Sequence, residues 1–230
     1  MSIKAVLFDL DATLTERSLN DSETFYRILE QKGIEIPVEE VKQAHLKVKR
    51  ELGDKGEEQR GKIPLLEFYS MWNTRILKVL GVEDSDGKIL REIDDRWIDI
   101  CGMKVYPDTK PALVSLRCKG LKIGIVSGNY EEEIRKMLDT AGLDRTFFDI
   151  IVGADTIKRR KPDPEVFRYA LRQLEIEPQE AIYVGDDLER DYRSAERVGM
   201  NPLLIMRSDI AVQEEVRKIK SLVSLVDYLD

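Results

Sequence analysis

Short apolar runs that recur along the chain constrain its fold more than any other feature. Each run is rich in strand-forming residues, and helical patterns separate the later runs. The runs are residues 4–9, 121–126, 149–152, 181–184 and 202–206. The helical patterns are residues 109–119, 131–141 and 188–198, and each is followed by a glycine. This alternation predicts an α/β fold with a doubly wound, Rossmann-like parallel sheet.

Residues 16–104 interrupt the alternation, because they show helical periodicity and no convincing strand. Their expected apolar helix faces are Phe25, Ile28 and Leu29, then Val41, Ala44, Val48 and Leu52. Residues 53–62 are expected to form a polar loop, and residues 65–80 and 89–100 two more helices. We therefore predict a helical domain of residues 16–104, inserted into an α/β core of residues 1–15 and 105–230.

Length, charge and cysteine content exclude several classes of protein. A chain of 230 residues can bury the core of one large domain or of a core with an insertion. A net charge of -7 argues against a nucleic-acid partner, which usually requires a basic surface. No segment has the roughly 18 apolar residues that a membrane-spanning helix needs. Cys101 and Cys118 have no metal-ligand spacing, so we expect free thiols and a cytoplasmic protein.

Two carboxylates and a hydroxyl follow the first apolar run. Asp9, Asp11 and Thr13 lie where the chain leaves the predicted strand, at the sheet edge that binds ligands in doubly wound folds. Residues two apart on an extended backbone point the same way, so Asp9 and Asp11 could face one pocket. Their charges would repel each other unless a cation lay between them. The alternative is a pair of solvated turn aspartates.

A second acidic cluster follows the run at residues 181–184. Asp186 ends that run, and Asp187 and Asp191 lie in the turn and the first helical residues beyond it. Oxygen ligands of this kind suit Mg2+, which prefers octahedral geometry and keeps several waters. Alternatively, Asp186 or Asp187 caps the following helix and Asp191 compensates its dipole.

Two further strand ends carry groups suited to an anion. Ser127, Gly128 and Asn129 follow the second run and precede a helix, so a hydroxyl and backbone amides meet at a helix N-terminus. Lys161 follows the third run and precedes a helix that Pro164 can open. Taken singly, these residues could also be a helix cap and a surface loop charge.

The order of these four sites, each at the end of a successive strand, resembles the haloacid dehalogenase-like (HAD) hydrolase superfamily. The family motifs are Asp-x-Asp-x-Thr, a strand-terminal Ser or Thr, a Lys, and Gly-Asp with a further acid. The first motif, residues 161–164 and residues 185–191 are the specific parts of a resemblance that covers nearly the whole chain. The helical stretch resembles the cap domain of the family's phosphatase branch.

Carried over to this chain, the resemblance implies a role for each site residue. Asp9 would be the nucleophile and Asp11 the general acid and base. The phosphoryl group would be bound by Thr13, Ser127, Gly128, Asn129 and Lys161. Mg2+ would be held by Asp9, the main-chain carbonyl of Asp11 and Asp186, with Asp187 or Asp191 in the outer shell.

Departures from the family pattern refine the expected function. Ala12 stands where the family usually has glycine. The aspartate that matches Asp11 is typically absent from the dehalogenating and phosphonate-cleaving branches, so its presence favours ester hydrolysis. We expect a phosphatase for a small phosphorylated acid or sugar, similar to phosphoglycolate phosphatases, as a monomer or homodimer. A sugar phosphomutase keeps the same aspartate and is the alternative; a phosphoacceptor or binding module without turnover is a weaker one.

Side chains of the helical stretch give little further information. Arg60 and Lys62 could meet a substrate carboxylate, although loop charges are mostly solvated. His45 is expected to be structural or exposed, and Trp72 and Trp97 to lie in the core of the helical domain.

Overall fold

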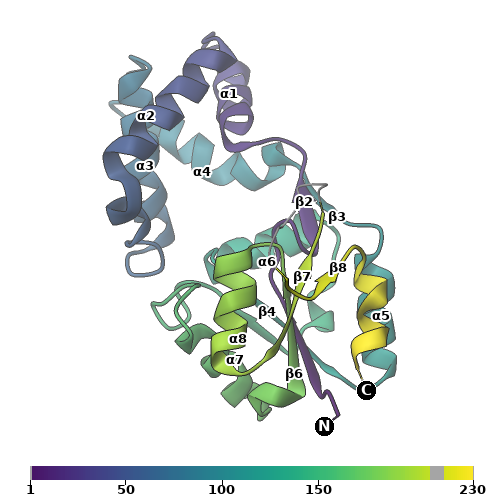
Figure 1. The fold of residues 1–230 in the computed structure, drawn as a ribbon. Helices are drawn as coiled ribbons and strands as arrows, with labels where there is room; N and C mark the ends of the chain where they lie inside the picture. The colour runs from purple at the N-terminus through teal and green to yellow at the C-terminus, as the bar shows by residue number, and fades with distance from the viewer. Residues whose placement is uncertain (1, 208–214, 230) are drawn as a thin grey trace. The chain divides into compact units, whose positions relative to one another are not determined.

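The structure is a computed structural model that describes residues 2–207 and 215–229, and the chain divides into two compact units (Figure 1). The core unit comprises Met1–Glu16 and Lys104–Asp230, and the helical unit comprises Arg17–Met103. Over the described residues, no helix is long and apolar enough to cross a membrane.

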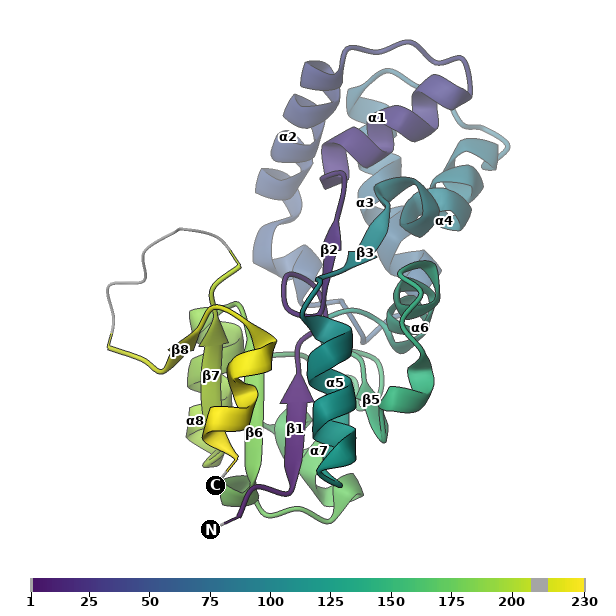
Figure 2. The ribbon, with the colours of Figure 1, turned by 90° about the vertical axis from the view of Figure 1, so that its right-hand side faces the viewer.

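The core unit is built on a six-stranded parallel sheet (Figure 2). Its strands are β1 (Ala5–Phe8), β4 (Lys122–Val126), β5 (Ile150–Val152), β6 (Ala181–Gly185), β7 (Asn201–Ile205) and β8 (Lys218–Ile219). They are arranged in the order β5-β4-β1-β6-β7-β8. All five predicted runs form strands of this sheet, which confirms the predicted α/β fold, while the two-residue strand β8 was not predicted.

Strand β1 lies at the centre of the sheet, and all four of its residues are fully buried. Phe8 is level with Ile125 on β4 and with Val184 on β6. The residues that follow these three parallel strands therefore emerge side by side at one edge of the sheet. This register is the reason that segments far apart in the sequence can form one site.

Helices cover both faces of the sheet, with α5 and η4 on one face and α7 and α8 on the other (Figure 2). The longer helices are α5 (Thr109–Cys118), α6 (Glu131–Thr140) and α7 (Glu165–Leu174). The predicted helix at 188–198 is divided into a π-helical turn, η3 (Leu188–Arg193), and a short α-helix, α8 (Ser194–Val198). Short 3-10 helices are η1 (Arg145–Phe147), η2 (Pro178–Glu180) and η4 (Leu222–Tyr228).

The helical unit consists of α1 (Asp21–Gln31), α2 (Val38–Glu57), α3 (Leu65–Val79) and α4 (Lys88–Cys101). The predicted apolar faces of the first two helices meet in its core, where Phe25, Val41 and Val48 are fully buried. The polar loop was predicted at residues 53–62, and its predicted first residue is wrong, because α2 continues to Glu57. Gly53 alone leaves the helical conformation, at a φ of 48° that glycine adopts readily, and the helix then resumes.

The chain passes between the two units through β2 (Thr15–Arg17) and β3 (Met103–Val105), which pair in a two-stranded sheet. These strands contradict the prediction that residues 16–104 hold none. A strand of three residues is too short to show an alternating pattern, so the sequence gave no signal for either one.

Candidate active site

A tight turn follows β1 and carries Asp9 and Asp11. Asp9 is 7% exposed, and its amide continues the strand by donating to the carbonyl of Val184 at 2.9 Å. The carbonyl of Leu10 then accepts the amides of Leu14 and Thr15, at 2.9 and 3.0 Å. Within this turn Ala12 has a φ of 54°, the left-handed region that a glycine enters with less strain. The turn therefore forms with alanine, but its backbone is strained at this residue.

Lys161 lies at the centre of a buried group of polar side chains. Its Nζ donates to Asp9 Oδ1 at 2.6 Å, to Asp191 Oδ1 at 2.5 Å and to the hydroxyl of Tyr183 at 3.0 Å. Lys161 is 6% exposed, and these bonds use all three hydrogens of the ammonium group. Lys161 and Asp9 are 152 residues apart in sequence. The structure thus brings the predicted nucleophile and the predicted lysine into direct contact.

Tyr183 is a residue that the sequence analysis missed. Its hydroxyl donates to the carbonyl of Val126 at 2.9 Å and lies 3.2 Å from Asp191 Oδ1. Its ring packs edge-on against Phe167, with the centroids 4.9 Å apart. In sequence Tyr183 looks like an ordinary strand residue. The one available signal was that a tyrosine in a fully buried strand needs a partner for its hydroxyl.

Three carboxylates gather beside Lys161. Asp9, Asp186 and Asp191 each offer a carboxylate oxygen, and these oxygens lie within 4.8 Å of one another. Asp186 is exposed, whereas Asp191 is buried. Three acids face one ammonium group, so the cluster carries an excess of negative charge. Oxygen donors with this charge fit Mg2+.

Gly185 allows Asp191 to reach this position. A Cβ at residue 185 would lie 2.4 Å from Cγ of Asp191, which is far inside van der Waals contact. The other oxygen of Asp191, Oδ2, accepts the amide of Asp187 at 3.0 Å. The Gly-Asp pair of the motif therefore has a steric reason in this chain: the glycine leaves room for the acid six residues later.

Asp187 has the capping role that the sequence analysis considered as an alternative. Its Oδ1 accepts the amides of Glu189 and Arg190 at the start of η3, at 3.0 and 2.8 Å. Its Oδ2 pairs with Nε of Arg190 at 2.9 Å. Asp187 is not among the three acids whose oxygens converge.

Burial and crowding raise the pKa values of Asp9 and Asp186. Burial raises the pKa of Asp9 to about 7, against the opposing effect of Lys161 and with a further rise from Asp191. Asp186 stays in contact with solvent, but the surrounding protein removes part of its hydration; this desolvation, followed by the charge of Asp191, raises its pKa to about 6. Burial lowers the pKa of Lys161, but the carboxylates of Asp191 and Asp9 outweigh it and the pKa is raised overall. Lys161 thus stays an ammonium, while Asp9 and Asp186 favour either a proton or a bound cation.

The end of β4 places the predicted anion-binding residues. Ser127 is buried, and its amide donates to the carbonyl of Val152 at 3.0 Å. Its Oγ accepts the amide of Asn129 at 3.3 Å, and Gly128 lies between them. The side-chain amide of Asn129 donates to Asp11 Oδ2 at 3.2 Å, so the ends of β4 and β1 are joined.

Thr13 is fully buried in the turn after β1. Its hydroxyl has no hydrogen-bond partner in the part of the chain that the structure describes. Such an unsatisfied buried group is costly unless another molecule satisfies it.

In the helical unit, Arg60 and His45 have polar partners within the unit itself, and Lys62 is exposed. The guanidinium of Arg60 bonds Glu57 at 3.2 Å and the hydroxyl of Tyr69 at 3.0 Å, and lies over the ring of Phe68. Nδ1 of His45 lies 2.9 Å from the carbonyl of Val41, and burial lowers the pKa of the ring. Trp72 and Trp97 pack against the buried cluster of this unit, as predicted.

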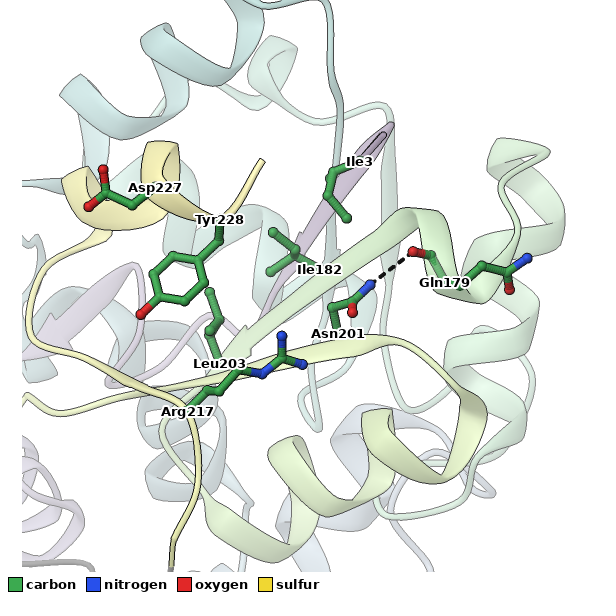
Figure 3. Close-up of a pocket in the computed structure, with 8 residues that line it drawn as sticks. All are labelled: Ile3, Gln179, Ile182, Asn201, Leu203, Arg217, Asp227 and Tyr228. Carbon is green, nitrogen blue, oxygen red and sulfur yellow. Dashed lines mark hydrogen bonds between the residues drawn. The ribbon is translucent and has the colours of Figure 1, made fainter. Parts of the chain in front are cut away.

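A cavity of about 530 Å³ lies at the other edge of the sheet, where the strands begin (Figure 3). Asn201, the first residue of β7, donates its side-chain amide to the carbonyl of Gln179 there, at 2.9 Å. The cavity is lined by Ile3, Gln179, Ile182, Asn201, Leu203, Arg217, Asp227 and Tyr228. None of the predicted site residues lines it.

Comparisons with known proteins find hydrolases that are similar to this chain in sequence. A family model described as haloacid dehalogenase-like hydrolase matches residues 6–205. A glyceraldehyde 3-phosphate phosphatase of Methanopyrus kandleri is 31% identical over 210 residues, which cover 89% of this chain and 84% of the relative. A phosphoglycolate phosphatase of Rhodospirillum rubrum is 28% identical over 209 residues, which cover 88% of this chain and 79% of the relative.

A solved structure shows the same similarity at the level of the fold. The crystal structure of a HAD phosphatase from Thermococcus onnurineus is 28% identical, with a TM-score of 0.64. The match covers 99% of this chain and 98% of that one. The similarity therefore includes the strand ends that carry the acids and the lysine as well as the helical insertion.

Proposed function

The chain belongs to the haloacid dehalogenase-like hydrolase family, and from this premise we propose that it is a Mg2+-dependent phosphatase acting through an aspartyl-phosphate intermediate. The substrate class we assign is a small phosphorylated metabolite. Two relatives are phosphatases named for glyceraldehyde 3-phosphate and phosphoglycolate, which are both small monoesters. The observation that carries the proposal is the buried ammonium of Lys161, held 2.6 Å from Asp9 beside two further acids.

Asp9 is the nucleophile in this proposal. Its carboxylate oxygen attacks phosphorus, and the bond between phosphorus and the ester oxygen breaks. The charge on the transferring group must be neutralised and the nucleophile held in line, since there is little other chemistry for the protein to perform. Asp9 is suited to this role because Lys161 and the amide bond to Val184 fix its position.

Asp11 is the general acid and base. It protonates the departing ester oxygen in the first step. In the second step it takes a proton from water, whose oxygen attacks phosphorus and releases phosphate and the free carboxylate of Asp9. The bond from Asn129 to Asp11 Oδ2 supports this role, because it fixes a side chain that is only partly buried.

The cation would be held by carboxylates of Asp9 and Asp186, with the main-chain carbonyl of Asp11, and Asp191 beside them. Bound Mg2+ supplies charge neutralisation for these acids and for the transferring phosphoryl group. Without a cation, the pKa of about 7 keeps much of Asp9 protonated at neutral pH. Binding of a cation therefore also favours the ionised nucleophile.

The phosphoryl oxygens would be bound on the other side of the site. Lys161 neutralises their charge. The hydroxyl of Ser127 and the backbone amides of Gly128 and Asn129 donate hydrogen bonds to them. The buried hydroxyl of Thr13 completes this set. In the same proposal, the inserted helical unit is the family's cap domain and selects the substrate.

The test is a panel of phosphomonoesters that contains glyceraldehyde 3-phosphate, phosphoglycolate and sugar phosphates, assayed by phosphate release. We expect turnover that EDTA abolishes and added Mg2+ restores. Asp9→Asn should lower kcat by at least about 10^4-fold, since the nucleophile is lost. Asp227→Asn, at the opposite edge of the sheet, is the matched control and should keep the parent kcat.

Other outcomes would contradict particular parts of the proposal. Parent-level turnover by Asp9→Asn would exclude the covalent mechanism. Full activity after thorough chelation would exclude the metal. Transfer of phosphate between two positions of one sugar, without release, would identify a mutase instead.

A further inference from the structure

The carbonyl groups of the turn after β1 are held by different kinds of partner. The carbonyl of Leu10 accepts amides of the turn itself. The carbonyl of Leu14 accepts the amide of Tyr106 at 3.2 Å and the hydroxyl of Thr109 at 2.8 Å. Between them, the carbonyl of Thr13 is bound by a charged group, the guanidinium of Arg207.

Arg207 makes a two-pronged contact with this carbonyl. Its Nε and Nη2 donate to the oxygen of Thr13 at 3.2 and 2.6 Å. The guanidinium also lies over the ring of Tyr106, with Cζ 3.9 Å from the centroid. The side chain is 11% exposed, so these contacts are shielded from water. A planar fork that both stacks and donates is specific to arginine.

Asp108 holds the guanidinium in place. Its Oδ2 accepts Nη1 of Arg207 at 2.9 Å, the hydroxyl of Ser221 at 3.0 Å and the amide of Leu222 at 2.8 Å. Burial raises the pKa of Asp108, but the bonds from Arg207 and Leu222 outweigh it and the pKa is lowered overall. Asp108 is therefore ionised at neutral pH, and Arg207 is bound from two sides.

We propose that Arg207 is a positioning residue for the phosphatase reaction: by holding the carbonyl of Thr13, it fixes the turn that carries Asp9 and Asp11. The inference rests on the proposed function of that turn. A strained residue such as Ala12 persists only where the surroundings over-determine the backbone. Arg207 supplies the charged contact next to it, one residue further along the chain.

The expected kinetic effect is on kcat. A displacement of about 1 Å in a catalytic group can cost roughly 100-fold in rate. Arg207→Gln, which keeps a donor but loses the charge, the fork and the stacking, should lower kcat between about 10-fold and 100-fold. KM should stay within a factor of about three, because no substrate contact is removed. Arg207→Lys should recover part of the loss, since an ammonium can still donate to the carbonyl.

Arg117→Gln is the matched control. Arg117 lies on α5, and it also bridges a carboxylate and a carbonyl: Asp149 Oδ2 at 2.8 Å and the oxygen of Thr146 at 3.4 Å. It is half-buried and has no role in the site. This variant should keep the parent kcat. Such a result would show that a lower kcat in Arg207→Gln is specific to Arg207 and does not follow from removing any arginine that bridges a carboxylate and a carbonyl.

Hydrogen exchange supplies a measurement that does not depend on turnover. The amides of Leu14 and Thr15 are bonded to the carbonyl of Leu10. Arg207→Gln should accelerate exchange of these amides about tenfold or more in the presence of Mg2+, while amides of α7 keep the parent rates. An equal acceleration everywhere would show a general loss of stability and would overturn the positioning role.

The outcomes separate the two hypotheses. A parent protein without Mg2+-dependent turnover overturns the proposed function. An active parent whose Arg207→Gln variant keeps both the kcat and the exchange rates overturns the role of Arg207. If Arg207→Gln does not fold, the Arg207→Lys variant provides the test. Parent values of both kcat and the exchange rates in Arg207→Lys would overturn the positioning role of Arg207.

Discussion

The two units of this protein differ in whether they bury charged side chains. Among the described residues, the buried ionic side chains are Asp9, Lys161 and Asp191, and all belong to the core unit. In the helical unit, the buried polar side chains are the neutral Thr24 and Asn73. The ion pairs of the helical unit keep contact with solvent: Arg27 pairs with Glu30 on the surface of one helix, and Lys32 pairs with Glu92 across two helical segments.

This difference indicates what each unit is built for. Apolar burial stabilises the helical unit, and its exposed ion pairs contribute little. The core unit instead concentrates charges at one sheet edge, where desolvation opposes their attraction. The arrangement costs stability and supplies a charged site, which is the usual relation between stability and function. Four substitutions test this contrast.

The largest effect is expected for Lys161→Met, because it leaves Asp9 and Asp191 buried without their cation. We expect a loss of about 3 kcal/mol in the free energy of unfolding near pH 8, measured with urea in EDTA. The folded pKa of Asp9 is about 7 even with the lysine, which lowers it, so removal of the ammonium raises this pKa further above the unfolded value. The penalty is therefore present at high pH and shrinks as the pH falls and Asp9 binds a proton.

Two results would argue against this interpretation. One is an equal loss in the free energy of unfolding near pH 5 and near pH 8, since protonation of the buried carboxylate would then play no part. The other is a comparable loss in Lys4→Met, which removes an ion pair between the exposed Lys4 and the half-buried Glu180 and should change stability by less than about 0.5 kcal/mol.

A smaller effect is expected for Gly185→Ala. The added Cβ would lie 2.4 Å from Cγ of Asp191 and would push that acid away from Lys161. Overpacking of this kind costs about 2 kcal/mol, and the affinity for Mg2+ should fall as well. Urea unfolding and calorimetry would measure the two changes. Gly128→Ala is the control for stability, because its Cβ would meet nothing within 4 Å, and an equal loss there would contradict the steric argument.

Tyr183→Phe removes only the hydroxyl that bonds Lys161 and Val126. We expect a loss of about 1 kcal/mol, since Lys161 and the carbonyl of Val126 each lose a buried partner. A double-mutant cycle with Lys161→Met should show that the two losses are coupled. Additive losses would mean that the hydroxyl does not act through the lysine.

The smallest effect, and one of opposite sign, is expected in the helical unit. Burial raises the pKa of Asp94 to about 6, against the opposing hydrogen bond from Asn73. The folded pKa lies above the unfolded value, so the ionised carboxyl destabilises the fold above about pH 6 and not near pH 4. Asp94→Asn should thus stabilise the protein by less than about 1 kcal/mol near pH 8, because the group is half-exposed, and should have no effect near pH 4. Destabilisation at the higher pH would refute this.

Local signals made much of the architecture predictable. Apolar runs mark the larger strands, and glycines mark helix ends, so both were visible in the sequence. The meeting of Asp9, Lys161 and Asp186 at one edge followed from parallel strands together with the family resemblance. Strands β2, β3 and β8 were missed because two or three residues show no periodicity. The continuation of α2 was missed because Gly53 breaks the helix for one residue only.

Long-range contacts of single side chains could not be predicted. The bond from Arg207 to Asp108 spans 99 residues, and neither residue belongs to a motif. Tyr183 is indistinguishable in sequence from a strand residue that only fills the core. The burial of Asp191 depends on the absence of a side chain at Gly185, a steric relation that spacing does not reveal.

The pairing of β2 with β3 has a consequence for how such proteins can diversify. Both crossing points of the chain are neighbouring strands, which lie about 4.8 Å apart in a sheet. An insertion whose two ends are so close can be lengthened, shortened or replaced while the parent sheet keeps every hydrogen bond between its strands. The two short strands therefore form an insertion point at which evolution or an engineer could place a different domain without changing the active site of the core unit.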